Sequence, residues 1–387
     1  MAITKIAVRN AWFQVHKWIG LILAIAIIPI SITGAALVWH DGLDEWLNPV
    51  RVAEGAPMLA PGAYAAAATT HLAAGETLAS LDIPEQGAVV ASAARPPQPG
   101  GGRPVRTQIW LGPADAAVLD TAGSDEGVIR VMHVLHGSLF IPEWGRAIVG
   151  WVGAAMLISS LSGIWLWWPT AGRWIKGLRW RRHRHFDTNL HHLFGFWIAI
   201  PLFILSATGV WISFPKAFER FDAPKADGGK PNDKRGGEAK GPSREQRLRA
   251  RPIADPAVPL DHALALTGAA APGRVARISW PTDVAPQWIV AIGPDARDRQ
   301  TEVKVDAATG ATTARPPSTD PETLARLMRR IHDGSDMGLM WQTIVFLGGL
   351  LPAILGITGI IMWWRARGWR DERDRRQQTG KARPAST

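Results

Sequence analysis

The chain contains no cysteine among its 387 residues. This absence excludes disulfides, thiolate metal ligands, iron–sulfur clusters and the covalent attachment of c-type haem. Any metal centre must therefore rely on histidine, methionine or oxygen ligands. The sequence also lacks a glycine-rich fingerprint after a strand and lacks a P-loop, which argues against a nucleotide-binding domain.

Charged side chains are missing from four long apolar runs. The mean hydropathy is only +0.01 although 47% of the residues are hydrophobic, so the apolar residues are concentrated in a few places. Each run holds about 20 residues, enough to cross a hydrocarbon core of about 30 Å. Tryptophan gathers at the ends of the runs, as in the aromatic belt of membrane proteins. We therefore predict four transmembrane helices, in the runs 19–39, 147–168, 193–214 and 343–364.

Basic residues flank these runs unevenly. Residues 169–190 carry six Lys or Arg against one acid, and residues 365–387 carry eight against three. The positive-inside rule predicts that both segments and the N-terminus are cytoplasmic, and that residues 40–146 and 215–341 lie outside. The first run is longer than a typical signal-peptide core, so we expect a retained anchor. The net charge of +10 is mostly explained by these basic cytoplasmic segments. The expected partner of the basic residues is membrane lipid, and the charge does not indicate nucleic-acid binding.

The first and third runs repeat one another at an offset of 175 residues. The offset pairs identical residues: His16 with His191, Gly20 with Gly195, Ala24 with Ala199, Ser31 with Ser206 and Gly34 with Gly209. Spacings of three, four or seven residues place them on one face of a helix. A histidine at one end of a face of small residues suits a flat ligand held between two helices, most simply a haem.

The second and fourth runs repeat at an offset of 196. The paired residues are Met132 with Met328, His136 with His332, Gly153 with Gly349, Ser162 with Thr358, Gly163 with Gly359 and Trp167 with Trp363. Each half therefore has two crossings and begins on the same side of the membrane. This order predicts a duplicated, parallel repeat related by a pseudo-twofold axis along the membrane normal.

Each external segment predicts a small α+β domain. Short Ala/Leu-rich helices are expected at 61–74 and 258–267, followed by alternating, strand-like stretches. The expected strands are 88–94, 105–111, 274–280, 286–292 and 301–305, with a last strand after the turn at 306–310. Residues 222–252 are rich in Lys, Gly, Pro and Asp without apolar periodicity, which predicts a linker.

The complete pattern resembles the PepSY-associated transmembrane family, and within it the di-haem siderophore reductases of the inner membrane. The pattern is H-x-W-x-G…TG, a small α+β domain, an LHGS-type amphipathic stretch and G…SG…WW, all duplicated. The resemblance implies a four-helix membrane bundle, two periplasmic PepSY-like domains, two b-type haems and one-electron reduction of a ferric siderophore.

We expect the following order along the chain. The segments are a transmembrane helix (12–40), a PepSY-like domain (41–125), an amphipathic helix with a transmembrane helix (126–168), a basic cytoplasmic loop (169–188), a third transmembrane helix (189–214), a linker with a second PepSY-like domain (215–320), an amphipathic helix with the last transmembrane helix (321–364), and a cytoplasmic tail (365–387).

The predicted topology sorts the histidines into two layers. His16 and His191 begin helices at the cytoplasmic face, whereas His136 and His332 precede helices at the periplasmic face. Two imidazoles on opposite sides of a haem suit electron transfer, so we expect an inner and an outer haem iron ligated by these pairs. Further cofactor-binding candidates make room for the haem or pack against it: Gly20, Gly195, Met132 and Met328.

Three other histidines are weaker candidates because the repeat does not support them. The offsets pair His133 with Arg329, His192 with Lys17, and His40 with Pro215. His133 and His192 could serve as contacts around a haem rather than as ligands. His40 ends the first predicted helix and could serve the substrate or the outer haem.

These patterns lead to one functional prediction and two alternatives. The chain is expected to be an inner-membrane oxidoreductase that takes electrons from quinol, a reduced flavin or a soluble reductase. Its substrate would be a periplasmic ferric siderophore, bound near Trp46, Arg51 and Trp110. One alternative is a haem-bearing electron-transfer subunit for another periplasmic oxidoreductase. The other is a non-enzymatic protein whose PepSY domains bind peptides or a peptidase.

Overall fold

The computed structural model describes residues 4–96, 105–168, 183–222, 246, 249–295, 299–317 and 323–381. Most of the predicted basic loop (169–188) and most of the predicted linker (222–252) lie outside these residues. The chain forms two compact units. The helical unit comprises residues 1–40, 131–225 and 322–387, and the sheet unit comprises residues 41–130 and 226–321.

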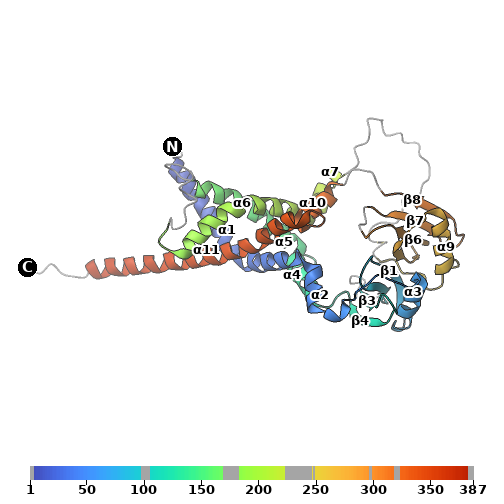
Figure 1. The fold of residues 1–387 in the computed structure, drawn as a ribbon. Helices are drawn as coiled ribbons and strands as arrows, with labels where there is room; N and C mark the ends of the chain where they lie inside the picture. Colours follow the sequence, from blue (N-terminus) through green and yellow to red (C-terminus); the bar gives the residue numbers. More distant parts are fainter. Residues whose placement is uncertain are drawn as a thin grey trace, which may run out of the picture. The chain divides into compact units, whose positions relative to one another are not determined.

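Four of the described helices are long and apolar enough to cross a membrane (Figure 1). They are α1 (Lys5–Leu37), α5 (Gly145–Trp167), α6 (Phe186–Ser213) and α11 (Gly338–Lys381, with the candidate span at Gly338–Trp369). Shorter helices are α4 (Val128–Ser138), α7 (Pro215–Asp222) and α10 (Leu324–Asp333). The Thr4 side chain caps α1 by accepting from the Ala7 N–H, and Gly334, at φ 77°, ends α10.

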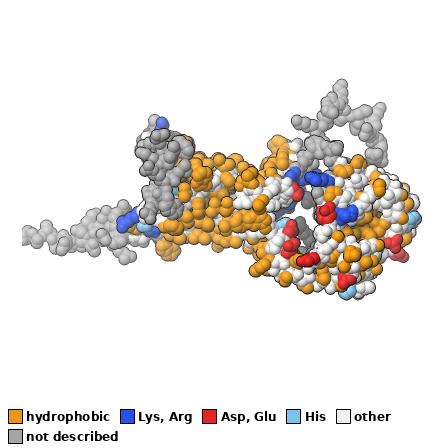
Figure 2. All heavy atoms as spheres, in the orientation of Figure 1, with side chains coloured by type: hydrophobic (Ala, Val, Ile, Leu, Met, Phe, Trp, Pro, Cys, Tyr) orange, Lys and Arg blue, Asp and Glu red, His pale blue; other side chains and the backbone are white. Residues whose placement is uncertain are grey.

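The long helices pack as a bundle in which α1 and α6 each contact both α5 and α11. Small residues permit close approach, since Gly349 of α11 faces the backbone of Ala35 in α1. Hydrophobic side chains cover the surface of the bundle (Figure 2), and Ile25 is 85% exposed. Exposed apolar side chains over four long helices are what a lipid environment requires.

Two arginines fasten the ends of these helices. Arg9 of α1 donates to the carbonyl oxygens of Leu166 and Trp168, which close the last turn of α5. Arg365 of α11 makes a two-point ion pair with Asp187, in the first turn of α6, with both N–O distances at 2.8 Å. Such paired contacts fix the orientation of the guanidinium group.

The sheet unit is built from one antiparallel sheet of eight strands. The first four are β1 (Thr77–Asp82), β2 (Val89–Ala94), β3 (Arg106–Leu111) and β4 (Val118–Gly123). The last four are β5 (Val275–Ser279), β6 (Gln287–Ile292), β7 (Thr301–Asp306) and β8 (Thr312–Arg315). The strand order is β4-β3-β2-β1-β5-β6-β7-β8. The helical elements are α2 (His40–Leu47), η1 (Pro49–Arg51), α3 (Pro61–Thr69) and α9 (Leu260–Ala270).

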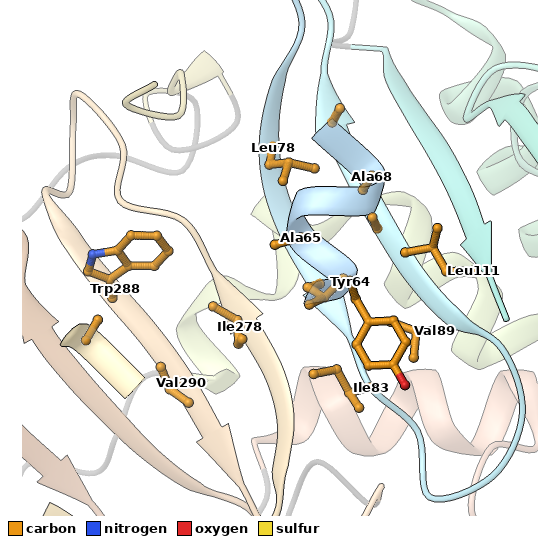
Figure 3. Close-up of a cluster of buried hydrophobic side chains, with 14 of the residues drawn as sticks. Tyr64, Ala65, Ala68, Leu78, Ile83, Val89, Leu111, Ile278, Trp288 and Val290 are labelled. Carbon is orange, nitrogen blue, oxygen red and sulfur yellow. The ribbon is translucent and has the colours of Figure 1, made fainter. Parts of the chain in front are cut away.

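The hydrophobic core lies on one face of this sheet, under α3 and α9. Figure 3 shows Tyr64 of α3 over Val89 and Leu111 of the first half, and Trp288 beside Val290 in the second. The Tyr64 hydroxyl accepts from the Met58 and Leu59 amides, and the Trp288 indole N–H donates to the Val258 carbonyl. Each large aromatic ring is thus buried with its polar atom satisfied.

The two predicted α+β domains share a continuous sheet rather than forming two separate ones. Strands β1 and β5 pair in the middle, with Leu81 opposite Ile278 and Asp82 opposite Arg277. In two separate four-stranded sheets, β1 and β5 would each be an edge strand with unpaired backbone N–H and C=O groups. Their pairing satisfies these groups. The α+β part expected from the sequence is therefore present, and its two halves form a single unit.

Candidate functional site

The helical unit brings His16 and His191 together. His16 lies on α1 and His191 on α6, with ring centroids 6.4 Å apart and ring planes at 90°. The His16 Nδ1 is 3.1 Å from the Ser159 carbonyl oxygen and 3.0 Å from the Ser162 hydroxyl. A carbonyl can only accept, so His16 carries its hydrogen on Nδ1 and leaves the lone pair on Nε2.

His191 is held in the corresponding way by α11. Its Nδ1 is 3.0 Å from the Thr358 hydroxyl oxygen. That hydroxyl already donates to the carbonyl oxygens of Ile354 and Leu355, at 2.8 and 3.1 Å. The hydroxyl therefore accepts from His191, which also carries its hydrogen on Nδ1 and leaves Nε2 open.

A second pair, His136 and His332, has similar spacing. Their ring centroids are 6.1 Å apart, with ring planes at 49°. The His136 Nδ1 donates to the Ile30 carbonyl of α1 at 2.9 Å, and the His332 Nδ1 donates to the Leu205 carbonyl of α6 at 3.1 Å. Both rings again leave Nε2 open.

Burial keeps this second pair neutral. Burial lowers the pKa of His136. Burial, together with the repulsion that two protonated rings would exert on each other, lowers the pKa of His332 to about 4. Both groups lie on α4 and α10, outside the four spanning helices. At neutral pH both imidazoles therefore retain the nitrogen lone pair that a metal ligand needs.

Each of the four rings lies against a glycine of a neighbouring helix. A Cβ on Gly34 would lie 2.6 Å from His136, and one on Gly209 would lie 3.1 Å from His332. At the first pair, a Cβ on Gly163 would lie 3.3 Å from His16, and one on Gly359 would lie 3.6 Å from His191. Sequence reasoning placed Gly34 and Gly209 on the face of small residues that makes room for a flat ligand and paired Gly163 with Gly359, but it did not predict that a histidine lies against each of these glycines.

Replacing Gly34 with alanine should disturb the second pair selectively. At 2.6 Å from the His136 ring carbon, the added methyl forces the imidazole to move, at a cost of about 1–3 kcal/mol. Gly359→Ala is the matched control, because its methyl would make ordinary contact with His191 at 3.6 Å. The absorbance spectrum of bound haem should change in Gly34→Ala and stay unchanged in Gly359→Ala. Equal spectra of wild type and Gly34→Ala would show that the contact between Gly34 and His136 does not matter.

The remaining predicted site residues occupy less defined positions. A Cβ on Gly20 or Gly195 would meet no atom within 4 Å, so the space beside each residue is open to a ligand. Met132 and Met328 are half-buried on α4 and α10, one turn before His136 and His332. The open space beside Gly20 and Gly195 is thus compatible with the predicted flat ligand.

The weaker candidates contact other histidines. His40 does not end the first helix as predicted: α1 stops at Leu37, and His40 begins α2. Its ring centroid lies 6.0 Å from that of His133. His192 stacks on His183 at 4.5 Å and meets His191 edge-on at 6.5 Å. His40 and His133 thus contact each other, and His192 contacts both His183 and His191.

The pair spacing fits a metal between two imidazoles. A metal–imidazole bond is about 2 Å long and the ring centre lies about 1.1 Å behind the nitrogen, so ligating rings on opposite sides of one metal have centres about 6.3 Å apart. The centroid distances of 6.4 and 6.1 Å match this separation. In each ligating imidazole the other nitrogen usually donates to a fixed acceptor, as all four do here. The residues present therefore fit a haem at both pairs.

The sheet unit contains a separate cleft of about 530 Å³. One row of residues crosses four strands on the face opposite α3 and α9: Trp110, Val90, Asp82 and Arg277 are paired in register. Arg51 lies 4.0 Å above the Trp110 ring and bonds Asp120, which lowers the pKa of that carboxyl. Of the predicted substrate residues, Arg51 and Trp110 line the cleft, whereas Trp46 is 76% exposed and is not part of the lining.

The architecture defines a membrane protein with four spanning helices and an antiparallel α+β unit. The family described as PepSY-associated TM region matches residues 13–366. The chain belongs to this family, which confirms the family-level resemblance drawn from its motifs. None of the curated proteins matches the chain.

Proposed function

We propose that this protein is a di-haem oxidoreductase of the bacterial inner membrane that reduces a ferric siderophore in the periplasm. One observation carries the proposal: two histidine pairs have the separation of axial ligands, with centroids at 6.4 and 6.1 Å. All four histidines have Nδ1 engaged and Nε2 open. A structural anchor for the sheet unit has no need of four histidines in this arrangement.

The bound haems would supply reversible one-electron transfer at their irons. The chain's own part is to supply the ligand nitrogens and hold them still. The Ser159 and Ile30 carbonyls fix the rings of His16 and His136 and increase the basicity of their open nitrogens.

We further propose that the two halves are a duplication with a parallel pseudo-twofold axis. Equivalent contacts support this interpretation: the partners Ser162 and Thr358 of the inner pair are 196 residues apart. The partners Ile30 and Leu205 of the outer pair are 175 residues apart, as are His16 and His191. In the sheet, the central strands β1 and β5 pair with each other, as a twofold axis between two equal halves requires.

The positive-inside rule supplies the proposed orientation. Both termini and the basic loop would be cytoplasmic, with the His16–His191 pair on that side. The His136–His332 pair and the sheet unit would be periplasmic. Quinol in the membrane, or a soluble reduced flavin or reductase, would be the electron donor, since the sequence carries no nucleotide-binding fingerprint of its own.

We propose that the ferric chelate binds in the cleft of the sheet unit. Its volume of about 530 Å³ is within the usual range of ligand pockets. Two arginines line it, and both are already paired: Arg51 with Asp120, and Arg277 with Asp82. Five carboxylates line it as well: Asp41, Asp44, Glu45, Asp82 and Asp295. The excess of negative charge should favour cationic or neutral chelates over trianionic ones.

This preference can be measured with gallium(III) chelates, which bind like ferric chelates but are not reduced. By calorimetry, a cationic hydroxamate complex should bind more tightly than a trianionic catecholate complex. Glu45→Gln should reduce the difference about threefold, the effect of one exposed charge. Glu302→Gln, which does not line the cleft, should leave it unchanged. Tighter binding of the trianionic complex would refute the charge argument.

The function itself is tested by the absorbance of the purified protein. We expect two b-type haems per chain, low-spin and extractable without chemical cleavage, because the chain has two histidine pairs and no cysteine. A pyridine haemochrome assay gives the ratio directly. A ratio of one haem per chain would show that one of the two proposed haem sites is wrong. A colourless protein would leave peptide or peptidase binding as the remaining interpretation.

A further inference from the structure

The Trp167 side chain is buried but its polar atom is unsatisfied. Trp167 is the last residue of α5 and is 4% exposed. Its indole nitrogen has no hydrogen-bond partner within the described part of the chain. An indole N–H can only donate, and buried donors in native proteins almost always have an acceptor. The position therefore calls for an acceptor from a bound molecule.

The surroundings of the indole connect it to the inner histidine pair. Gly163, one turn earlier on α5, is the glycine that faces the His16 ring. The indole stacks on Phe196, with ring centroids 4.1 Å apart, and Phe196 follows His191 by five residues on α6. Arg9 of α1 holds the carbonyls on either side of Trp167. The helices that carry His16 and His191 thus both contact the end of α5 where Trp167 lies.

The equivalent residue of the other half does not share this situation. Trp363 lies 196 residues later, is half-buried, and has the Arg367 guanidinium 5.8 Å from its ring. Among the described residues, its nitrogen is not one of the buried, unsatisfied side-chain atoms. The unsatisfied donor is therefore specific to α5.

We propose that the Trp167 N–H donates a hydrogen bond to a propionate carboxylate of the haem held between His16 and His191. The inference rests on the proposed function, because the haem is the acceptor it requires. A carboxylate is the strongest acceptor on the haem periphery, and a bond to a charged acceptor gains most from a buried donor. A quinone carbonyl could supply the same chemistry, and the experiment separates the two sources.

The test is a spectroelectrochemical titration of the full-length protein, purified free of quinone. Trp167→Phe keeps an aromatic ring for the stack on Phe196 but removes the N–H. The uncompensated carboxylate charge then favours the ferric state, so the ratio of reduced to oxidised inner haem at a fixed potential should fall about fivefold, the effect of one hydrogen bond. Trp167→His retains a ring N–H and should recover part of the change. Trp363→Phe should leave the ratio unchanged.

The outcomes separate the interpretations. An inner-haem potential and haem content equal to wild type in Trp167→Phe would overturn the proposal. So would a shift seen only after quinone is added, which would identify quinone as the acceptor, or an equal shift in Trp363→Phe. If Trp167→Phe loses the inner haem, retention of that haem by Trp167→His supports the proposal, and its loss there overturns it. A colourless wild-type protein would instead overturn the proposed function.

Discussion

Replacing His191 with alanine should remove one of two haems and leave the other. The His191 ring has its Nδ1 held by Thr358 and lies 6.4 Å from His16, the separation of two axial ligands of one haem. The haem-to-protein ratio should fall from about two to about one, since a ligated haem depends on its axial bonds. Electron entry from the cytoplasmic side should stop, while an artificial external donor should still reduce the remaining haem. His16→Ala should behave in the same way.

His192→Ala is the matched control for this prediction. His192 is adjacent in sequence but stacks on His183 rather than pairing with His16. The variant should keep both haems and most of its activity, with at most a small shift in potential from the lost supporting contact. Two haems and full activity in His191→Ala, or loss of a haem in His192→Ala, would mean that the repeat identifies the wrong ligand.

The sequence predicted the long helices and the histidine pairs because both depend on strong, regular signals. Four runs without charge have one stable arrangement, the membrane helix. The offsets of 175 and 196 paired each histidine with the one that the structure brings closest. The contacts between the glycines and the histidine rings could not be predicted in this way. That Gly34 of α1 lies against His136 of α4 depends on which helices are neighbours, and a pattern within one helix does not contain that information.

Some strands were missed because their alternation is disturbed. In β1 the register shifts between Leu78 and Ser80, so Leu78 and Ala79 are both buried and the period of two is lost. In β4 only Gly123 is buried, because the strand lies at the edge of the sheet. The strands predicted at 88–94, 105–111, 274–280, 286–292 and 301–305 match β2, β3, β5, β6 and β7.

The joining of the two half-sheets was also beyond sequence reasoning. It depends on backbone groups of Ser80, Leu81 and Asp82 meeting those of Arg277, Ile278 and Ser279. Backbone pairing leaves no trace in the side-chain pattern, apart from the Asp82–Arg277 ion pair on the cleft face. The cleft could not be predicted either, because the residues that line it come from both sides of the junction between β1 and β5. Location alone led to Arg51 and Trp110. The pairing of β3 with β2 explains why Trp110 lines the cleft, and Arg51 of η1 lines it because it lies over the Trp110 ring.

A ferric chelate supplied only from the periplasmic side should reoxidise the reduced protein, and His136→Ala or His332→Ala should each abolish this. The proposed orientation puts the second histidine pair and the sheet unit on that side. A large hydrophilic chelate does not enter the hydrocarbon to reach the His16–His191 pair, so its electrons must come through the outer pair. Losing either ring removes one axial ligand, and reoxidation should slow by several orders of magnitude while the inner haem stays reduced.

Stopped-flow absorbance on sealed, oriented vesicles measures this directly, with dithionite-reduced protein and the chelate confined to one side. Val131→Leu is the matched control, because it changes an exposed residue of α4 without removing a ring. It should retain reoxidation. Equally fast reoxidation from the cytoplasmic side would overturn the orientation. If neither side reoxidises intact haems, the protein passes electrons to another periplasmic oxidoreductase, because the histidine pairs would then be competent and the chelate would not be their substrate.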